Sequence, residues 1–110
     1  MNTVAGYLSV LLNGVRTQTS FSVDYARWAM AQQLVLRAMN DAALWGLAGA
    51  LGVTPYGPDP GASTGDVEVE FVADFSMGGN SSGRVEWHGI PEGAAAAIAA
   101  QCAEAAAYLA

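Results

Sequence analysis

The chain contains no lysine, and its only basic side chains are four arginines spread along 110 residues. Nucleic acids are bound by clustered Lys and Arg that neutralise phosphates, and anionic membrane surfaces attract similar clusters. Ten carboxylates against four arginines give the chain a net charge of −6. We therefore expect no nucleic-acid partner and no membrane partner, whereas a basic protein partner is compatible with the composition.

Cysteine and histidine each occur once, as Cys102 and His88. One cysteine cannot form a disulfide within the chain, and neither residue type is numerous enough for a Cys- or His-rich metal centre. The sequence also lacks a P-loop and a nucleophile elbow. These absences lead us to expect no metal, no cofactor and no enzymatic activity. Because the N-terminus lacks the positive start of a signal peptide, we expect a cytoplasmic protein.

Alternation of apolar and polar side chains over residues 66–77 is the clearest structural pattern, and it predicts a half-buried strand. A segment rich in Gly, Ser and Asn at 78–83 predicts a loop, after which alternation resumes over 84–88. The two runs therefore predict an antiparallel hairpin with an apolar inner face and a polar outer face.

The register of this hairpin decides which polar residues meet. If Phe75 lies opposite Trp87 on the inner face, Asp74 faces His88 on the outer face. A carboxylate beside an imidazole suits acid–base chemistry, so a small enzyme or ligand-binding protein that uses Asp74 and His88 is one alternative function. A weak cross-strand ion pair is the simpler interpretation.

Another hairpin is expected in the first quarter of the chain, where hydrophobic runs flank Asn13 and Gly14. An Asn-Gly pair favours a type I′ turn, because both central residues need positive φ. A two-residue turn pairs Leu12 with Val15 and places the apolar side chains of both strands on one face. A helix over residues 3–13 is the alternative, because several apolar residues there also fit helical spacing.

Helices are predicted after each hairpin. Residues 24–52 have an apolar pattern on nearly all sides, which predicts burial on more than one side, with Asp24 as the N-cap. Asn40 or Asp41 is the point at which this helix would divide in two. The last helix is expected to begin at Pro91 and to have a narrow apolar seam. The seam consists of Ile98, Cys102, Ala105 and Leu109.

The predicted element order is strand–strand–helix twice, in residues 6–52 and 66–110, joined by a Pro- and Gly-rich loop at 53–65. We predict a single domain over residues 1–110, of the α+β class and built as a two-layer sandwich. Its sheet would have four antiparallel strands with the helices on one face, in ββαββα order. A helical N-terminal segment is the alternative architecture.

Five acidic residues share the outer face of the hairpin that begins at residue 66, together with Arg84. This acidic set consists of Asp66, Glu68, Glu70, Asp74 and Glu86. One interpretation is a solvated face, and another is a docking surface for a basic protein partner. We expect no metal there, because carboxylates spaced by two along a strand seldom converge on one ion.

Small residues recur along the predicted helix at 24–52 and would let another backbone approach closely. They are Ala42, Gly46, Gly49 and Ala50. Tight packing within one domain explains such a face, and self-association into a homo-oligomer is the functional alternative.

The function we expect is that of a small, acidic, non-enzymatic protein-binding module that uses the acidic hairpin face. An inhibitor of a basic partner, of the immunity or phage anti-defence type, fits by analogy of size and charge. A structural subunit of a larger assembly, such as a phage virion component, is the main alternative. Low charge and an almost entirely apolar central helix favour that alternative.

Overall fold

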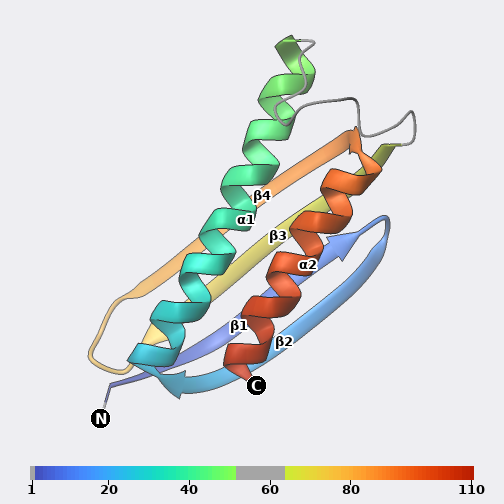
Figure 1. The fold of residues 1–110 in the computed structure, drawn as a ribbon. Helices are drawn as coiled ribbons and strands as arrows, with labels where there is room; N and C mark the ends of the chain where they lie inside the picture. The colour runs from blue at the N-terminus through green and yellow to red at the C-terminus, as the bar shows by residue number, and fades with distance from the viewer. Residues whose placement is uncertain (1, 52–63) are drawn as a thin grey trace.

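The computed structural model describes residues 2–51 and 64–110, so most of the loop predicted at 53–65 lies outside the described residues. The elements follow one another in ββαββα order. They are β1 (Thr3–Leu12), β2 (Val15–Asp24), α1 (Tyr25–Leu51), β3 (Thr64–Phe75), β4 (Asn80–Pro91) and α2 (Glu92–Leu109). The strands form one antiparallel sheet in the order β2–β1–β3–β4, with both helices on the same face (Figure 1). The predicted α+β fold is therefore confirmed.

The first hairpin has the predicted register, with Leu12 opposite Val15. Asn13 and Gly14 form its turn with φ values of 50° and 83°, the positive φ at both positions that a type I′ turn requires. The alternative of a helix over residues 3–13 is wrong. β1 pairs with β2 along one edge and with β3 along the other, so its backbone groups find their partners in the sheet.

The second hairpin is longer than predicted, and its register differs. Gly78 and Gly79 adopt positive φ values of 106° and 88°, conformations that cost glycine little, so the chain reverses early and β4 begins at Asn80. Most of the segment predicted as a loop is thus part of a strand. As a result, Trp87 lies opposite Val67.

This register separates the two residues of the expected acid–base pair. Asp74 lies opposite Asn80, eight residues from His88 along β4. At about 3.3 Å per residue, that spacing corresponds to roughly 26 Å. The pairing of Phe75 with Trp87, and with it that of Asp74 with His88, is wrong.

α1 begins where the sequence predicts. The Asp24 side chain accepts a hydrogen bond from the backbone N–H of Arg27 at 2.8 Å, as an N-cap does. The helix continues without a break through Asn40 and Asp41. There Asp41 accepts a hydrogen bond from the side chain of Gln101 in α2, at 3.0 Å, which ties the two helices together.

One described face of α1 is buried, contrary to the expected burial on more than one side. The buried residues are Trp28, Ala31, Val35, Ala38, Ala42 and Trp45. The opposite face leaves large hydrophobic side chains between 40% and 56% exposed. These are Met30, Leu36, Leu44 and Leu47. Because both faces are apolar, hydrophobicity alone does not indicate which of them packs inward.

The core lies between the sheet and the two helices. β3 contributes alternate residues from Val67 to Ala73, each at most 2% exposed. α2 contributes the predicted seam, which is confirmed because Ile98, Cys102, Ala105 and Leu109 are all buried. Over the described ranges, neither helix combines the length and the hydrophobicity needed to cross a membrane.

Candidate functional site

The candidate site is the face of the sheet opposite the helices, which we call the open face (Figure 1). Successive side chains of a strand point to opposite faces of a sheet. Since the odd-numbered residues of β3 from Val67 to Ala73 face the core, the even-numbered residues lie on the open face. β4 adds its own polar residues beside them, so the open face carries the whole acidic set.

Arg84 partly compensates this negative charge. Strand pairing places Glu68 directly opposite Glu86, and like charges in that position repel each other. A nitrogen of the Arg84 guanidinium lies 2.6 Å from a Glu86 oxygen and 3.4 Å from a Glu68 oxygen. A third carboxylate, that of Glu70, lies 3.7 Å from another nitrogen of the same group. The hydrogen bond with Glu68, followed by the nearby negative charges, raises the pKa of Arg84 above its usual value.

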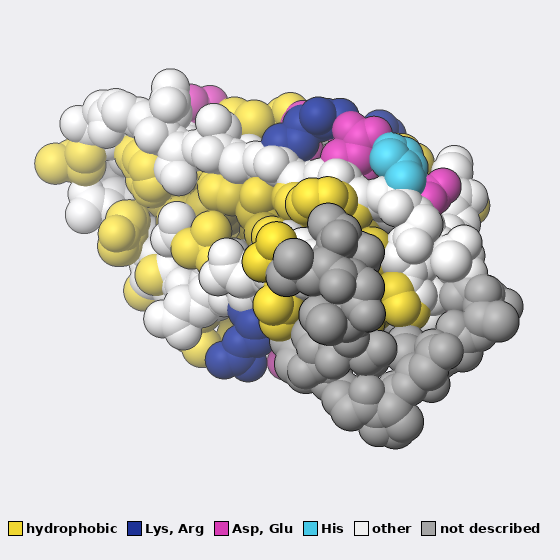
Figure 2. Space-filling model, turned by 90° about the horizontal axis from the view of Figure 1, so that it is seen from above, with side chains coloured by type: hydrophobic (Ala, Val, Ile, Leu, Met, Phe, Trp, Pro, Cys, Tyr) yellow, Lys and Arg dark blue, Asp and Glu magenta, His cyan; other side chains and the backbone are white. Residues whose placement is uncertain are grey.

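His88 extends this network toward the end of β4. Its Nε2 lies 2.7 Å from a Glu86 oxygen, and its Nδ1 lies 3.4 Å from an Asp66 oxygen. The hydrogen bond with Glu86, followed by that with Asp66, raises the pKa of His88. The hydrogen bond with His88 in turn lowers the pKa of Glu86. Figure 2 shows arginine, carboxylate and histidine side chains gathered along one side of the molecule.

The first hairpin also contributes to this face, which the sequence analysis missed. The hydroxyl of Tyr7 donates a hydrogen bond to Glu70 at 2.6 Å, and this bond raises the pKa of Tyr7. Arg16 donates a hydrogen bond to the hydroxyl of Ser9, which is only 2% exposed. Alternation along β1 and β2 could have placed these residues on the polar side. Their position beside the acidic set depends on the pairing of β1 with β3.

The acidic set is unevenly exposed to solvent. Glu68 lies between Leu11 of β1 and Glu86 of β4, and its side chain is only 12% exposed. The side chain of Asp66, at the start of β3, is 55% exposed. Asp74, near the other end of the same strand, is also exposed. The acids at the two ends of β3 are therefore the most accessible to another molecule.

The position of His88 predicts a pH dependence. Because its pKa is raised in the folded state, the protonated imidazole stabilises the fold at low pH, below the ordinary value of 6.5. This contribution disappears as pH rises through the folded-state pKa. His88 is the only histidine, so its ring resonance in an NMR titration reports that pKa directly.

We expect the measured pKa of His88 to lie above 6.5 and to fall toward that value in the variant Glu86→Gln. The variant His88→Gln should lose the corresponding pH dependence of the free energy of unfolding. A wild-type pKa at or below 6.5 would contradict the charged network.

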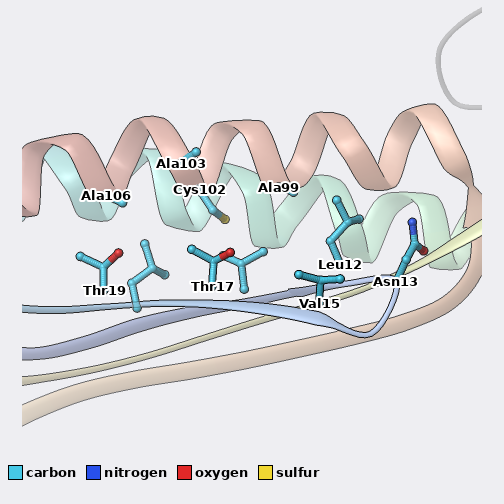
Figure 3. Close-up of a pocket in the computed structure, with 11 residues that line it drawn as sticks. Leu12, Asn13, Val15, Thr17, Thr19, Ala99, Cys102, Ala103 and Ala106 are labelled. Atoms are coloured by element: carbon cyan, nitrogen blue, oxygen red, sulfur yellow. The ribbon is translucent and has the colours of Figure 1, made fainter.

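A separate feature is an apolar groove of about 370 Å³ between α2 and the first hairpin (Figure 3). β1 and β2 form one side of it, through Leu12, Val15 and Thr17 among others, and alanines of α2 form the other. Among the described residues, none that lines the groove is charged. Cys102 also lies at this groove, and burial raises the pKa of its thiol to about 12.

The positions expected for self-association are only partly described. Ala42 is fully buried in the core of this chain, which agrees with tight internal packing. The surroundings of Gly46, Gly49 and Ala50 lie outside what the structure describes. Within residues 2–51 and 64–110, no group of three or more His, Cys, Asp or Glu side chains is arranged to hold a metal ion.

The fold and the site together define a class of protein: a small α+β domain whose sheet has one face covered by helices and one face bearing a charged network. No protein family model matches the chain, no curated protein matches its sequence, and no solved structure matches its fold. Function is therefore inferred from the site itself.

Proposed function

We propose that this protein is a non-enzymatic binding module whose open face docks on the basic surface of a protein partner. The observation that supports this most directly is the gathering of five carboxylates on the face of the sheet away from both helices. The guanidiniums of Arg84 and Arg16 offset two of these five charges, and Asp24 at the end of β2 adds one on the same side, which leaves −4 on the open face while His88 is neutral. Such a surface attracts basic partners and accelerates their association.

The contacts of Arg84 suggest how recognition would proceed. One guanidinium here satisfies several carboxylates at once, a geometry that suits planar, multidentate hydrogen bonding. Separate arginines of a partner would each bind one of the exposed acids, Asp66 and Asp74, which lie at opposite ends of β3. A cytoplasmic inhibitor of a basic protein, such as one that handles nucleic acids, is the form of this function that we favour, by analogy of size and charge.

Neutralising the site tests the proposal against a charge-matched control. The first variant combines Asp66→Asn with Asp74→Asn, the two exposed acids of the open face. The control combines Glu92→Gln with Glu104→Gln, two exposed acids of α2. Both variants remove two negative charges from the molecule. With an oligoarginine peptide as the probe, we expect the first variant to weaken binding by about tenfold and the control to change it little.

Fluorescence anisotropy of the labelled peptide measures both affinities, and repeating the titration at several salt concentrations gives their salt dependence. Wild-type binding should weaken steeply as salt is added, because exposed charges are screened. Equal weakening in the two variants would mean that only the net charge matters, and the open face would then not be the site. Binding that is insensitive to salt would contradict the proposal as well.

A structural subunit of a larger assembly, such as a phage virion component, is the second candidate. It is favoured by the exposed hydrophobic side chains on the outer face of α1, such as Leu44 and Leu47. Contiguous exposed apolar surface is typical of interaction sites. Sedimentation velocity at increasing concentration separates the candidates, because an assembly subunit would form species larger than a dimer.

A further inference from the structure

The two edges of the sheet differ in their protection against pairing with another strand. β4 has charged side chains along its length and ends at Pro91. Gly89 in β4 has a positive φ of 72°, and the pairing of β4 with β3 is irregular between Gly65 and Val67. These are features that block edge-to-edge pairing. β2 pairs with β1 over ten residues without irregularity, and it contains no proline or lysine. Its outer backbone groups therefore form an open template for another strand.

We propose that β2 binds a second copy of this chain, the two β2 strands pairing antiparallel about a twofold axis at Ser20. An added strand must keep its apolar side chains on the helix side of the sheet. An identical strand meets this condition when the axis is perpendicular to the sheet. The interface is then self-complementary, as twofold homodimers require.

Charge selects this register. The charged residues of β2 are Arg16 and Asp24, at opposite ends of the strand and on the same side of its alternation. With Ser20 on the axis, Arg16 of each copy lies directly opposite Asp24 of the other, which gives two favourable cross-strand pairs. Moving the axis by one residue, to Thr19, would place Arg16 opposite Ser22 and lose both pairs.

Both charged groups keep hydrogen-bonding capacity for these contacts. Arg16 donates to the neutral hydroxyl of Ser9, and its guanidinium has further N–H groups. One carboxylate oxygen of Asp24 accepts the capping bond from Arg27, which leaves the second oxygen for the partner.

The same register covers an exposed hydrophobic side chain. Val15 at the start of β2 is 69% exposed. In the proposed pairing, Val15 of one copy lies beside the last residues of β2 of the other, again twice per dimer. Val15 and Thr17 also line the apolar groove of Figure 3, so the grooves of the two copies would lie next to each other on either side of the twofold axis.

This pairing gives a closed assembly. The two β2 edges pair with each other, which gives a continuous sheet of eight strands, twice the four of one chain. Only the protected β4 edges remain at its ends. The two open faces then lie on the same side, so a partner with two basic patches would bind with increased avidity. The dimer does not depend on the proposed function, because β2 and β4 are opposite edges of the sheet.

Exchange of the two charges tests the interface. In the homodimer of Arg16→Asp, both cross-strand pairs consist of two acidic groups. In that of Asp24→Arg, both pairs consist of two basic groups. In a mixture of the two variants, the heterodimer has two complementary pairs. By sedimentation equilibrium, we expect a wild-type mass of twice 11.3 kDa, dimerisation at least about tenfold weaker in each variant alone, and recovery in the mixture. A monomeric wild type, or variants that still dimerise alone, would overturn the proposal.

Cysteine cross-linking checks the register without altering the cap of α1. Directly opposite residues in an antiparallel pair have Cβ atoms about 4.5–5.5 Å apart, so a bifunctional thiol reagent of short reach should join Ser20→Cys to its own copy. In the control Ser22→Cys, the two cysteines are four residues out of register, roughly 13 Å apart, and the same reagent should not join them. Native Cys102 is buried and does not compete. A dimer that cross-links equally at both positions, or at neither, would refute the pairing at Ser20.

Discussion

Replacement of Trp28 by alanine should destabilise the protein by about 3–5 kcal/mol, the range observed when a large buried aromatic side chain is truncated. Trp28 is only 1% exposed and packs between two phenylalanines. Its ring stacks on that of Phe21 at 5.3 Å with an interplanar angle of 9°, and it is tilted against that of Phe71 at 5.6 Å. Since Phe21 lies in β2 and Phe71 in β3, one α1 side chain joins strands from both hairpins. Its loss would remove a large part of the roughly 5–15 kcal/mol that stabilises a typical domain.

Urea unfolding followed by circular dichroism measures this effect without depending on tryptophan fluorescence. Met30→Ala is the matched control, because Met30 lies on the same helix but is 53% exposed, and a change within about 0.5 kcal/mol is expected. Trp28→Phe should cost less than Trp28→Ala, because it keeps an aromatic ring in the core. It also removes an indole N–H that is buried without a hydrogen-bond partner among the described residues. An equal decrease in the free energy of unfolding in Trp28→Ala and Met30→Ala would contradict the central position of Trp28 in the core.

The first hairpin could be predicted in detail because its signals are local and agree with one another. Asn13 and Gly14 specify a turn with two positive φ values, and that turn fixes the register of both strands. The alternation of β1 and β2 fits the same register. A one-residue slip would have moved every apolar side chain to the open face, so pattern and turn exclude the alternatives together.

The second hairpin lacked such a signal. Residues 76–83 contain three glycines and three serines, which permit a turn at several positions. The turn forms at Gly78 and Gly79, and the polar residues that follow continue as strand. The acidic face could be predicted, because alternation along β3 alone places Glu68 and Glu70 together. Which charged residues meet could not be predicted, because that depends on the register.

Two other features depend on contacts between segments far apart in the sequence. The contact of Tyr7 with Glu70 requires β1 to lie beside β3, and no local pattern specifies that neighbour. The orientation of α1 was ambiguous because its two faces have similar hydrophobicity. It is decided by Trp28, whose ring fits between Phe21 and Phe71.

The junction between β1 and β3 joins the two ββα halves, and at Gly6 the backbone of β3 leaves no room for a side chain. A Cβ atom added there would overlap the backbone carbonyl oxygen of Val72 in β3 and lie 2.7 Å from the carbonyl carbon. Backbone atoms of a central strand cannot move aside as a flexible side chain can. We therefore expect Gly6→Ala to cost about 3 kcal/mol, at the upper end of the usual penalty for overpacking.

Gly93→Ala makes the same chemical change where there is room for it. Gly93 lies in the first turn of α2 and is exposed, and an added Cβ would have no neighbour within 4 Å. Alanine favours helix over glycine, so this variant should gain about 0.5–1 kcal/mol. One added methyl group should therefore lower the free energy of unfolding in Gly6→Ala and raise it in Gly93→Ala, and urea unfolding of both variants measures the two changes. A Gly6→Ala variant as stable as wild type would mean that the backbones of β1 and β3 are not in close contact at Gly6, which would contradict the pairing on which the open face depends.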